Sequence, residues 1–214
     1  MSKYVEQFFH LKCSVDTLNT VAPLKNGEKE ISEAMSLIQA IKPVVLREPM
    51  KYSILDLAAG NALTGIIAAY LLPVKKVFAI DIKVPNRDYS KIKRFKYLQE
   101  DLIKNHYPCG NILVPEGNNF IIVASHPCTN LAIRVIDIYK KNDNCKMLAM
   151  LPCCIDTQEL AQSKLPPRLI KNLGKYEAWT YYLSQLVNGT YKIDDSCLSP
   201  CRGLVTAVKK ELVV

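Results

Sequence analysis

The sequence predicts an α/β domain built on one sheet of seven strands, mostly parallel, with an antiparallel hairpin at its C-terminal end. Segments rich in apolar residues alternate along the chain with segments whose apolar residues recur at helical spacing. The early strand candidates are continuously apolar, as in Val77-Phe78-Ala79-Ile80, which is typical of parallel strands that helices cover on both faces. The last two strand candidates are joined by a segment too short to hold a helix, and this favours the hairpin.

The same patterns give the order of the elements. An amphipathic helix is expected first, from Glu28 to Leu46, because apolar residues recur there at helical spacing. The expected strands are Tyr52 to Asp56, Lys76 to Asp81, Phe95 to Leu98, Asn119 to Ser125, Lys146 to Leu151, Thr190 to Ser196 and Gly203 to Lys209. The other expected helices are Ala62 to Leu72, a short one at Tyr89 to Lys93, Thr129 to Lys141 and Arg168 to Val187.

Length and composition limit the class of protein. The chain has 214 residues, of which 49% are hydrophobic, enough for one well-cored domain over residues 49–214 after an N-terminal helical extension over residues 1–48. No apolar run approaches the roughly 18 residues that cross a bilayer, and the N-terminus has no export signal. Eight cysteines in such a chain favour reduced thiols. We therefore expect a cytoplasmic protein with no membrane partner.

The stretch from Ser53 to Gly65 carries the most informative local signal. It predicts a buried strand, a tight turn and the start of a helix, whose backbone amides can face polar groups of a ligand. Acidic residues follow the first three strands, at Asp56, Asp81 and Asp101. Because the carboxyl ends of parallel strands meet at one crevice, these side chains are expected to converge on one ligand. The alternative is that each caps a helix or lies in a solvated turn.

The turn itself resembles a known motif. Asp56-Leu57-Ala58-Ala59-Gly60-Asn61-Ala62 is similar to the acidic-x-Gly-x-Gly-x-Gly motif of class I S-adenosylmethionine (SAM) dependent methyltransferases, with Gly60 kept and alanine at the two other glycine positions. The resemblance implies a Rossmann-like methyltransferase fold, a SAM-binding domain over residues 49–214, and contacts of Asp81 with the ribose and Asp101 with the adenine. The cofactor-binding residues expected from it are Asp56, Ala58, Gly60, Asn61, Asp81, Ile82, Asp101, Leu102 and Ser125.

Two further motifs follow the fourth and fifth strands, where this fold places the transferred methyl group. They are Ser125-His126-Pro127-Cys128 and Pro152-Cys153-Cys154. Together with Leu198-Ser199-Pro200 they resemble a methyltransferase-domain family that includes methyltransferase-like proteins, the glutathione-S-transferase C-terminal-domain-containing protein and relatives of a tRNA 2'-O-methyltransferase. Thr129-Asn130-Leu131-Ala132 is similar to the family's Thr-Asp-Leu-Ala run, with Asn130 in place of the acid. The Asn/Asp-Pro-Pro-aromatic signature of amino methylation is absent.

Several roles remain open for these motifs, and His126, Cys128 and Cys153 are the catalytic candidates. His126 suits a general base or orienting group, while Cys128 or Cys153 suits covalent attack on a pyrimidine ring. Thiols from Cys128, Cys153, Cys154, Cys197 and Cys201 could also gather around a metal ion. No Cys-x-x-Cys pair supports a metal site, so none is assigned, and the remaining alternative is that the thiols pack the strand ends.

The charge points to the partner. The formal net charge is +8, with basic residues gathered at 83–87, 91–96 and 164–175, and a basic surface attracts phosphates. The alternative is that these residues form an ordinary solvated basic face. Charge and resemblance together favour RNA, either tRNA or rRNA, as the substrate. Trp179 and Tyr182 are expected to pack a helix on the sheet rather than to stack on bases. A binding protein without catalysis on the same scaffold is the alternative function, and a nicotinamide-dependent oxidoreductase is a more distant one.

Overall fold

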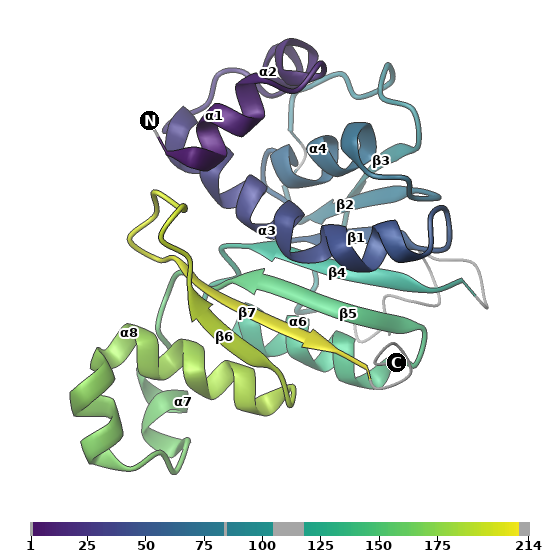
Figure 1. Ribbon diagram of the computed structural model, residues 1–214. Helices are drawn as coiled ribbons and strands as arrows, with labels where there is room; N and C mark the ends of the chain where they lie inside the picture. The colour runs from purple at the N-terminus through teal and green to yellow at the C-terminus, as the bar shows by residue number, and fades with distance from the viewer. Residues whose placement is uncertain (1, 84, 105–117, 210–214) are drawn as a thin grey trace.

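The computed structural model describes residues 2–83, 85–104 and 118–209. Its centre is one seven-stranded sheet in the order β3-β2-β1-β4-β5-β7-β6 (Figure 1). The strands are β1 (Ser53–Leu57), β2 (Val77–Asp81), β3 (Phe95–Gln99), β4 (Phe120–Ser125), β5 (Cys145–Leu151), β6 (Thr190–Ile193) and β7 (Gly203–Val208). The first five strands are parallel, and β7 runs antiparallel between β5 and β6. The predicted fold class and terminal hairpin are confirmed.

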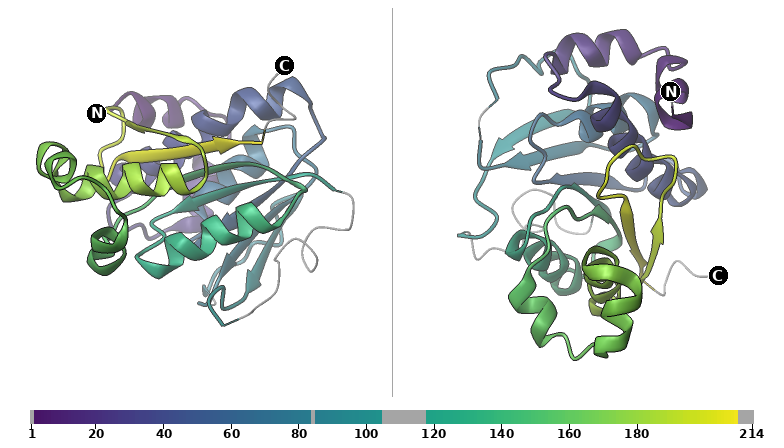
Figure 2. Two further views of the ribbon diagram at one scale, coloured as in Figure 1. Left: turned by 90° about the horizontal axis from the view of Figure 1, so that it is seen from below. Right: turned by 90° about the vertical axis from the view of Figure 1, so that its left-hand side faces the viewer.

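Helices cover both faces of the sheet. They are α1 (Lys3–Phe9), α2 (Ser14–Val21), α3 (Gly27–Arg47), α4 (Leu63–Leu71), α6 (Asn130–Lys141), α7 (Thr157–Gln162) and α8 (Pro167–Leu186). Figures 1 and 2 show α3 and α4 on one face, with α1 and α2 outside them, and α6 and α8 on the other. Each face has its own hydrophobic core. This double covering explains why β1 and β4 are almost wholly buried and continuously apolar.

The side chain of Trp179 shows how α8 is held. It is fully buried in the core between the sheet, α6 and α8, with the ring of Tyr182 5.8 Å away. An aromatic side chain of this size contributes a large share of the apolar surface that folding removes from water. Packing against the sheet is therefore confirmed for Trp179, and base stacking by this ring is excluded.

The N-terminal helices are tied to the far end of the chain by one buried carboxylate. Asp194, just after β6, accepts hydrogen bonds from the Tyr4 hydroxyl of α1 (2.9 Å) and the Ser36 hydroxyl of α3 (2.5 Å). Burial and the Asp194 carboxylate together raise the pKa of Tyr4. A buried carboxylate needs such partners, so the network fixes α1 and α3 against the β6–β7 connection.

Some predicted elements were wrong in detail. Residues Tyr89–Lys93 form turns instead of a helix, because Asp88 accepts a local hydrogen bond from the Ser90 amide and Tyr89 turns inward. The strand expected to reach Ser196 ends at Ile193, since Asp194 leaves the ladder for its hydroxyl partners. The long late helix is interrupted at Gly174, which has a φ of 77°. Helices α1 and α2 were expected only as part of the N-terminal helical extension, without separate bounds, and α7 was not predicted, because their apolar patterns are short.

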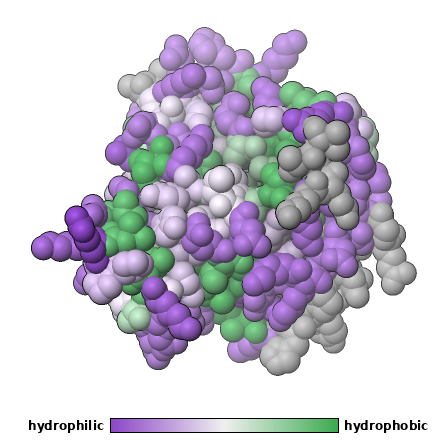
Figure 3. Space-filling view, turned by 60° about the horizontal axis from the view of Figure 1, so that its bottom comes forward, coloured by the Kyte–Doolittle hydropathy of each residue, from purple (hydrophilic) through white to green (hydrophobic). Residues whose placement is uncertain are grey.

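The outer surface offers no broad apolar face on the side that carries α6, α7 and α8. Hydrophilic residues cover most of that view, and hydrophobic residues form separate patches (Figure 3). Within the described ranges, no helix combines the length and the apolar character that a bilayer crossing requires.

Candidate active site

The site lies at the carboxyl edge of the parallel strands. The chain leaves β1 toward α4 on one face and leaves β4 toward α6 on the other, and β1 and β4 are neighbours in the sheet. In open α/β sheets this change of direction opens a crevice outside the strand ends, where ligands bind. The loops after β1, β2, β4 and β5 meet there.

The turn after β1 keeps a glycine-type backbone even where glycine has been replaced. Ala58, Gly60 and Ala62 all have left-handed φ angles, of 58°, 53° and 62°. An alanine in this region costs roughly 1 to 2 kcal/mol because its Cβ approaches the carbonyl oxygen. The Ala62 amide bonds to the Ala59 carbonyl (2.7 Å), which closes the turn. The motif is therefore kept in conformation although two of its glycines are missing.

Asp56 supports this turn from beneath. It is 1% exposed, and its Oδ2 accepts a hydrogen bond from the Gly65 amide at the start of α4 (2.8 Å). Burial raises the pKa of Asp56 to about 7; the Gly65 bond opposes this rise and the nearby Asp81 carboxylate adds to it. Asp56 does not line either of the cavities at this edge. Its place in the structure is below the turn.

Asp81 and Asp101 lie at the crevice itself. The two oxygens of Asp81 accept from the amides of Gly60 and Lys83, both at 2.9 Å. Asp101 accepts from the amides of Ile103 (2.9 Å) and Lys104 (3.1 Å), and these bonds lower its pKa despite some burial. Each carboxylate oxygen has a second lone pair, so both groups can still accept from a ligand.

Two cavities meet beside these carboxylates. The larger, of about 500 Å³, runs over the turn and along the start of α3, and the smaller, of about 140 Å³, lies beyond the end of β2. Ala58, Asp81 and Leu131 line both. A Cβ on Gly60 would meet no atom within 4 Å, so the turn borders open space. The combined shape is an elongated site with a polar body and a narrow end.

The narrow end has apolar walls. Ile82 and Ile103 line it and are 56% and 47% exposed, while the buried Leu102 forms its floor. Large apolar side chains at a cleft gain stability when a ligand covers them. The expected cofactor has a flat ring, a diol and a charged tail. The apolar walls suit the ring, Asp81 suits the diol and the larger cavity suits the tail, so the residues present fit SAM.

His126 stands on the wall of the larger cavity, held by a carboxylate from α3. Its Nε2 lies 2.7 Å from Oε1 of Glu33, which is 2% exposed, and Lys29 lies 3.0 Å from the same oxygen. Burial opposes ionisation of Glu33, but hydrogen bonds from His126, Ser199 and Lys29 outweigh it, and the pKa of Glu33 is below its usual value. His126 also has a left-handed φ of 59°. Strained backbone conformations of this kind are common at functional sites.

Three thiols lie next to His126. The Sγ atoms of Cys128, Cys153 and Cys154 are 2.8, 3.4 and 3.3 Å apart around the triangle. Cys128 and Cys153 also direct their thiols at the His126 carbonyl, at 3.4 and 3.7 Å. Burial raises the pKa of Cys128 and of Cys153, and for Cys153 the neighbouring thiols raise it further. Cys197 is buried away from them, beside Ser32 of α3.

Residues with no motif of their own support the turn from outside. The rings of Tyr89 and Tyr97 stack 5.4 Å apart at an interplanar angle of 4°, and the Tyr97 hydroxyl reaches the Gly60 carbonyl at 3.1 Å. Glu30 of α3 accepts from the Asn61 amide group at 2.7 Å. Tyr97 lies in a predicted strand, and Tyr89 and Glu30 lie in predicted helices, so none of these positions indicated a role in supporting the turn.

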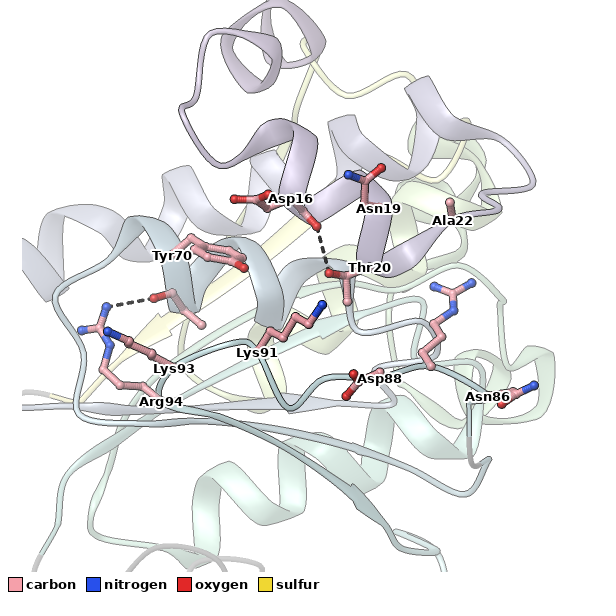
Figure 4. Close-up of a pocket in the computed structure, with 12 residues that line it drawn as sticks. Asp16, Asn19, Thr20, Ala22, Tyr70, Asn86, Asp88, Lys91, Lys93 and Arg94 are labelled. Atoms are coloured by element: carbon pink, nitrogen blue, oxygen red, sulfur yellow. Dashed lines mark hydrogen bonds between the residues drawn. The ribbon is translucent and has the colours of Figure 1, made fainter.

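A third cavity, of about 840 Å³, lies between α2, α4 and the chain that joins β2 to β3. Figure 4 shows Lys91, Lys93 and Arg94 around it, with Asp16 and Asp88 at its rim. Arg94 is engaged by the carbonyls of Ala69 (2.9 Å) and Val74 (3.0 Å), whereas Lys91 and Lys93 are exposed. This groove makes basic residues of the 83–96 segment accessible from outside.

The predicted site residues fall into two groups. The structure brings together at the cavities Ala58, Gly60, Asn61, Asp81, Ile82, Asp101, Leu102, Ser125 and His126. Asp56 lies beneath the turn, and Cys128 and Cys153 lie beside His126. Lys29, Glu33 and Ile103 also line the cavities and were not predicted. No sequence motif contains them, and only their positions in the folded structure reveal that they belong to the site. His10 is exposed and remote from the site, and His106 lies outside the described residues.

Comparison with known proteins agrees with this arrangement. A family described as a methyltransferase domain matches residues 27–162. No curated protein sequence shows significant similarity to the chain. Among solved structures, the methyltransferase domain of a bacterial Hen1 has a TM-score of 0.50 at 11% identity and covers 84% of this chain and 98% of its own.

Two further structures resemble the chain more weakly. The ribosomal protein L11 methylase of Lactobacillus delbrueckii subsp. bulgaricus has a TM-score of 0.48 at 16% identity, over 87% of this chain and 82% of its own. The plantazolicin methyltransferase BpumL, solved with S-adenosylhomocysteine, has a TM-score of 0.45 at 11% identity, over 95% and 92%. The family match covers more than half of the chain and confirms the resemblance to class I methyltransferases. The chain belongs to the methyltransferase-domain family, within the class I fold, and its cofactor is S-adenosylmethionine.

Proposed function

We propose that this protein transfers a methyl group from SAM to RNA, with tRNA or rRNA as the substrate class. The observation that carries the proposal is that His126, backed by Glu33, stands on the wall of the same cavity that the turn and Asp81 line. A group able to take a proton is thereby brought to the place where this fold presents the methyl group.

The cofactor contacts follow from the two cavities. SAM supplies an electrophilic methyl group. The Asp81 carboxylate would accept from the ribose hydroxyls, Ile82 and Ile103 would enclose the adenine, and Asp101 would accept from its amino group. Gly60 and Asn61 line the larger cavity, which would hold the tail of the cofactor. Helix α3 contributes Lys29 and Glu33 to the same wall, so it is a working part of the site.

His126 takes the role of general base. In this proposal the ionised Glu33 carboxylate, whose Oε1 lies 2.7 Å from Nε2, would hold the Nε2 proton, and Nδ1 would be the ring nitrogen that accepts a proton from the attacking group. A carboxylate that orients a histidine in this way fixes both its tautomer and its rotation. A hydroxyl or ring nitrogen is the acceptor that this arrangement suits.

The thiols are less suited to the chemical step. A nucleophilic cysteine needs a lowered pKa, because the thiolate is the reactive form. Burial acts in the opposite direction on both Cys128 and Cys153, and for Cys153 the neighbouring thiols raise the pKa further. We therefore assign methyl transfer to His126 and treat covalent attack by either cysteine as the alternative that mutation tests.

RNA as the acceptor is supported by the basic residues around the site. Lys25, Lys29 and Lys83 line the larger cavity, and the same β2–β3 connection continues with the exposed Lys91 and Lys93 at the neighbouring groove. A polyanion that follows this path neutralises its phosphates on lysines while one nucleotide enters the cavity. The seven described cysteines carry no disulfide, which supports action in a reducing compartment such as the cytoplasm.

The first experiment identifies the acceptor. SAM with a radiolabelled methyl group is incubated with the protein and either total RNA or total protein, and labelled RNA is digested to nucleosides. We expect label in RNA, lost in His126→Asn and retained in Cys128→Ala and Cys153→Ala. Label in protein alone would overturn the RNA assignment. SAM binding without label in either extract would favour the non-catalytic alternative.

A second experiment tests the basic path. Lys91→Glu with Lys93→Glu should weaken RNA binding and flatten its dependence on salt by about one unit of slope per lost phosphate contact. Lys192→Glu is the matched control, because Lys192 is exposed on edge strand β6 at the opposite end of the sheet. Equal effects of the two changes would remove the groove from the RNA path.

A further inference from the structure

The triangle of thiols beside His126 has the composition of a metal site. Cys128 follows β4, and Cys153 and Cys154 follow β5, so two loops contribute. The three Sγ atoms are mutually 2.8 to 3.4 Å apart. Among residues 2–83, 85–104 and 118–209, these three form the one cluster of metal-ligating side chains whose donor atoms all lie within 4.8 Å of one another.

The spacing is close to what zinc requires. A Zn–S bond of about 2.3 Å in a tetrahedral site separates the sulfur atoms by about 3.8 Å. The observed triangle reaches this size when each Sγ–Sγ distance grows by about 1 Å or less. Rotation of the side chains supplies this movement, since Cys154 is exposed and Cys128 and Cys153 are half-buried. Three thiolates also make a donor set that prefers zinc over magnesium or calcium.

The backbone that carries the thiols is fixed. Strands β4 and β5 pair in register up to Ser125 and Leu151, so the two loops start side by side. The Tyr176 hydroxyl donates to the Pro152 carbonyl (2.9 Å) and accepts from the Gly203 amide (3.0 Å). These bonds hold the end of β5 against α8 and β7, as supporting contacts around a metal site commonly do.

A fourth thiol approaches from the β6–β7 connection. The Sγ of Cys201 lies 3.2 Å from the carbonyl oxygen of Cys153. A structural zinc site is four-coordinate. Cys201 is not among the three thiols that lie within 4.8 Å of one another, so its half-buried side chain would have to turn from this carbonyl to supply the fourth ligand. The four cysteines then come from three separate connections of the sheet.

We propose that Cys128, Cys153, Cys154 and Cys201 bind one Zn²⁺ ion. Binding replaces the S–H protons, which pass to the buffer, so neither an oxidant nor a reductant takes part. The ion would link the ends of β4 and β5 to the β6–β7 connection, directly beneath the strained backbone of His126. This proposal does not depend on the methyl acceptor, and zinc binding is measured without methyl transfer.

The test is a titration of the full chain, freed of metal by a chelator, with Co²⁺ under a non-thiol reductant. We expect a sulfur-to-cobalt charge-transfer band that saturates at one Co²⁺ per chain and is displaced by Zn²⁺. The triple change Cys128→Ser, Cys153→Ser and Cys154→Ser should abolish the band. Cys201→Ser should weaken Co²⁺ binding at least tenfold, and wild-type affinity in that variant would overturn its assignment as fourth ligand.

Two controls keep the test decisive. Cys13→Ser, on α2 and remote from the cluster, should bind Co²⁺ as the wild type does. If the triple variant fails to fold by circular dichroism, the single change Cys154→Ser at the exposed corner replaces it. Absence of a charge-transfer band in the wild type, or its survival in the cluster variants, would overturn the site.

Discussion

The two halves of the crevice are built in different ways. The cofactor half, made of Ala58–Asn61, Asp81–Ile82 and Asp101–Leu102, consists of residues that directly follow β1, β2 and β3. The acceptor half, made of Ser125–Cys128 and Cys153–Cys154, depends on partners distant in the chain, above all Glu33. The first half is built mainly from strand ends, with the bond from Asn61 to Glu30 of α3 as a long-range support, whereas the second depends on Glu33 of α3 for the contact that holds His126.

The difference has a functional meaning. Contacts within a strand-turn-helix unit form wherever that unit forms, so they suit a cofactor shared by a whole family. Contacts between distant elements can be exchanged without altering the sheet, so they suit the part of the site that selects an acceptor. Mutations in the two halves should accordingly separate cofactor binding from methyl transfer.

The largest expected effect is in the acceptor half. His126→Asn removes the base, while asparagine tolerates the left-handed backbone of this position. Loss of a general base lowers the rate by about 10² to 10⁴, and the affinity for SAM should stay within about twofold. Single-turnover methyl transfer and SAM binding, measured on the same preparation, check this. Unchanged transfer would remove His126 from the mechanism.

The next effect concerns stability in the cofactor half. Native Asp56 holds its proton up to pH about 7, while the unfolded chain releases it near pH 3.9. The folded state therefore binds more protons between these values, and its stability falls as pH rises through that window, by at most roughly 4 kcal/mol. Asp56→Asn should abolish this loss, so its advantage over the wild type grows from pH 4 to pH 8.

Unfolding by urea at several pH values measures the effect. Asp143→Asn, at an exposed aspartate, is the control and should follow the wild-type profile. Parallel profiles for Asp56→Asn and the wild type would contradict the account of Asp56 as a buried, protonated support of the turn.

The smallest effect separates conformation from ligand contact within the turn. Ala62→Gly and Ala58→Gly both relieve a left-handed alanine. After the entropy that glycine adds to the unfolded chain, Ala58→Gly should stabilise the protein by roughly 0.5 to 1 kcal/mol. Ala62 is fully buried in the core, so Ala62→Gly also loses a methyl group worth about 0.8 kcal/mol and should be stabilised less. Thermal unfolding ranks the two variants. SAM affinity should change in Ala58→Gly alone, because Ala58 lines both cavities and Ala62 lines neither. Equal SAM affinities would show that Ala58 does not limit the cavity.

The contrast between local and long-range contacts also explains how much of the structure could be predicted from the sequence. The parallel strands, the terminal hairpin and the residues of the cofactor half follow from periodicity and from strand ends, because both are local. Glu33 looked like one more residue of an amphipathic helix, and its burial against His126 depends on how α3 crosses the sheet. The three thiols were candidates for one cluster together with Cys197 and Cys201, but the sequence could not show which of them meet. Cys128 and Cys153 are 25 positions apart and come together because β4 and β5 pair.

Two other differences between prediction and structure concern the segment 89–93 and the position of Asp56. The segment 89–93 has apolar and basic residues at near-helical spacing, yet the stacking of Tyr89 on Tyr97 and the Asp88 turn decide its conformation. Asp56 was expected at the ligand because its motif position implied it. Its burial, which the sequence alone does not reveal, places it beneath the turn.

The most direct test of the two-part site is a calorimetric titration of SAM into the wild type, Asp81→Ala and His126→Asn. In Asp81→Ala the ribose hydroxyls of SAM have no carboxylate to donate to. The two proposed hydrogen bonds to this charged acceptor are worth about 1.5 kcal/mol or more each, so the variant should bind SAM at least 100-fold more weakly. The wild type and His126→Asn should bind one SAM per chain with equal affinity. No binding to the wild type at millimolar SAM, or equal losses in the two variants, would contradict the account.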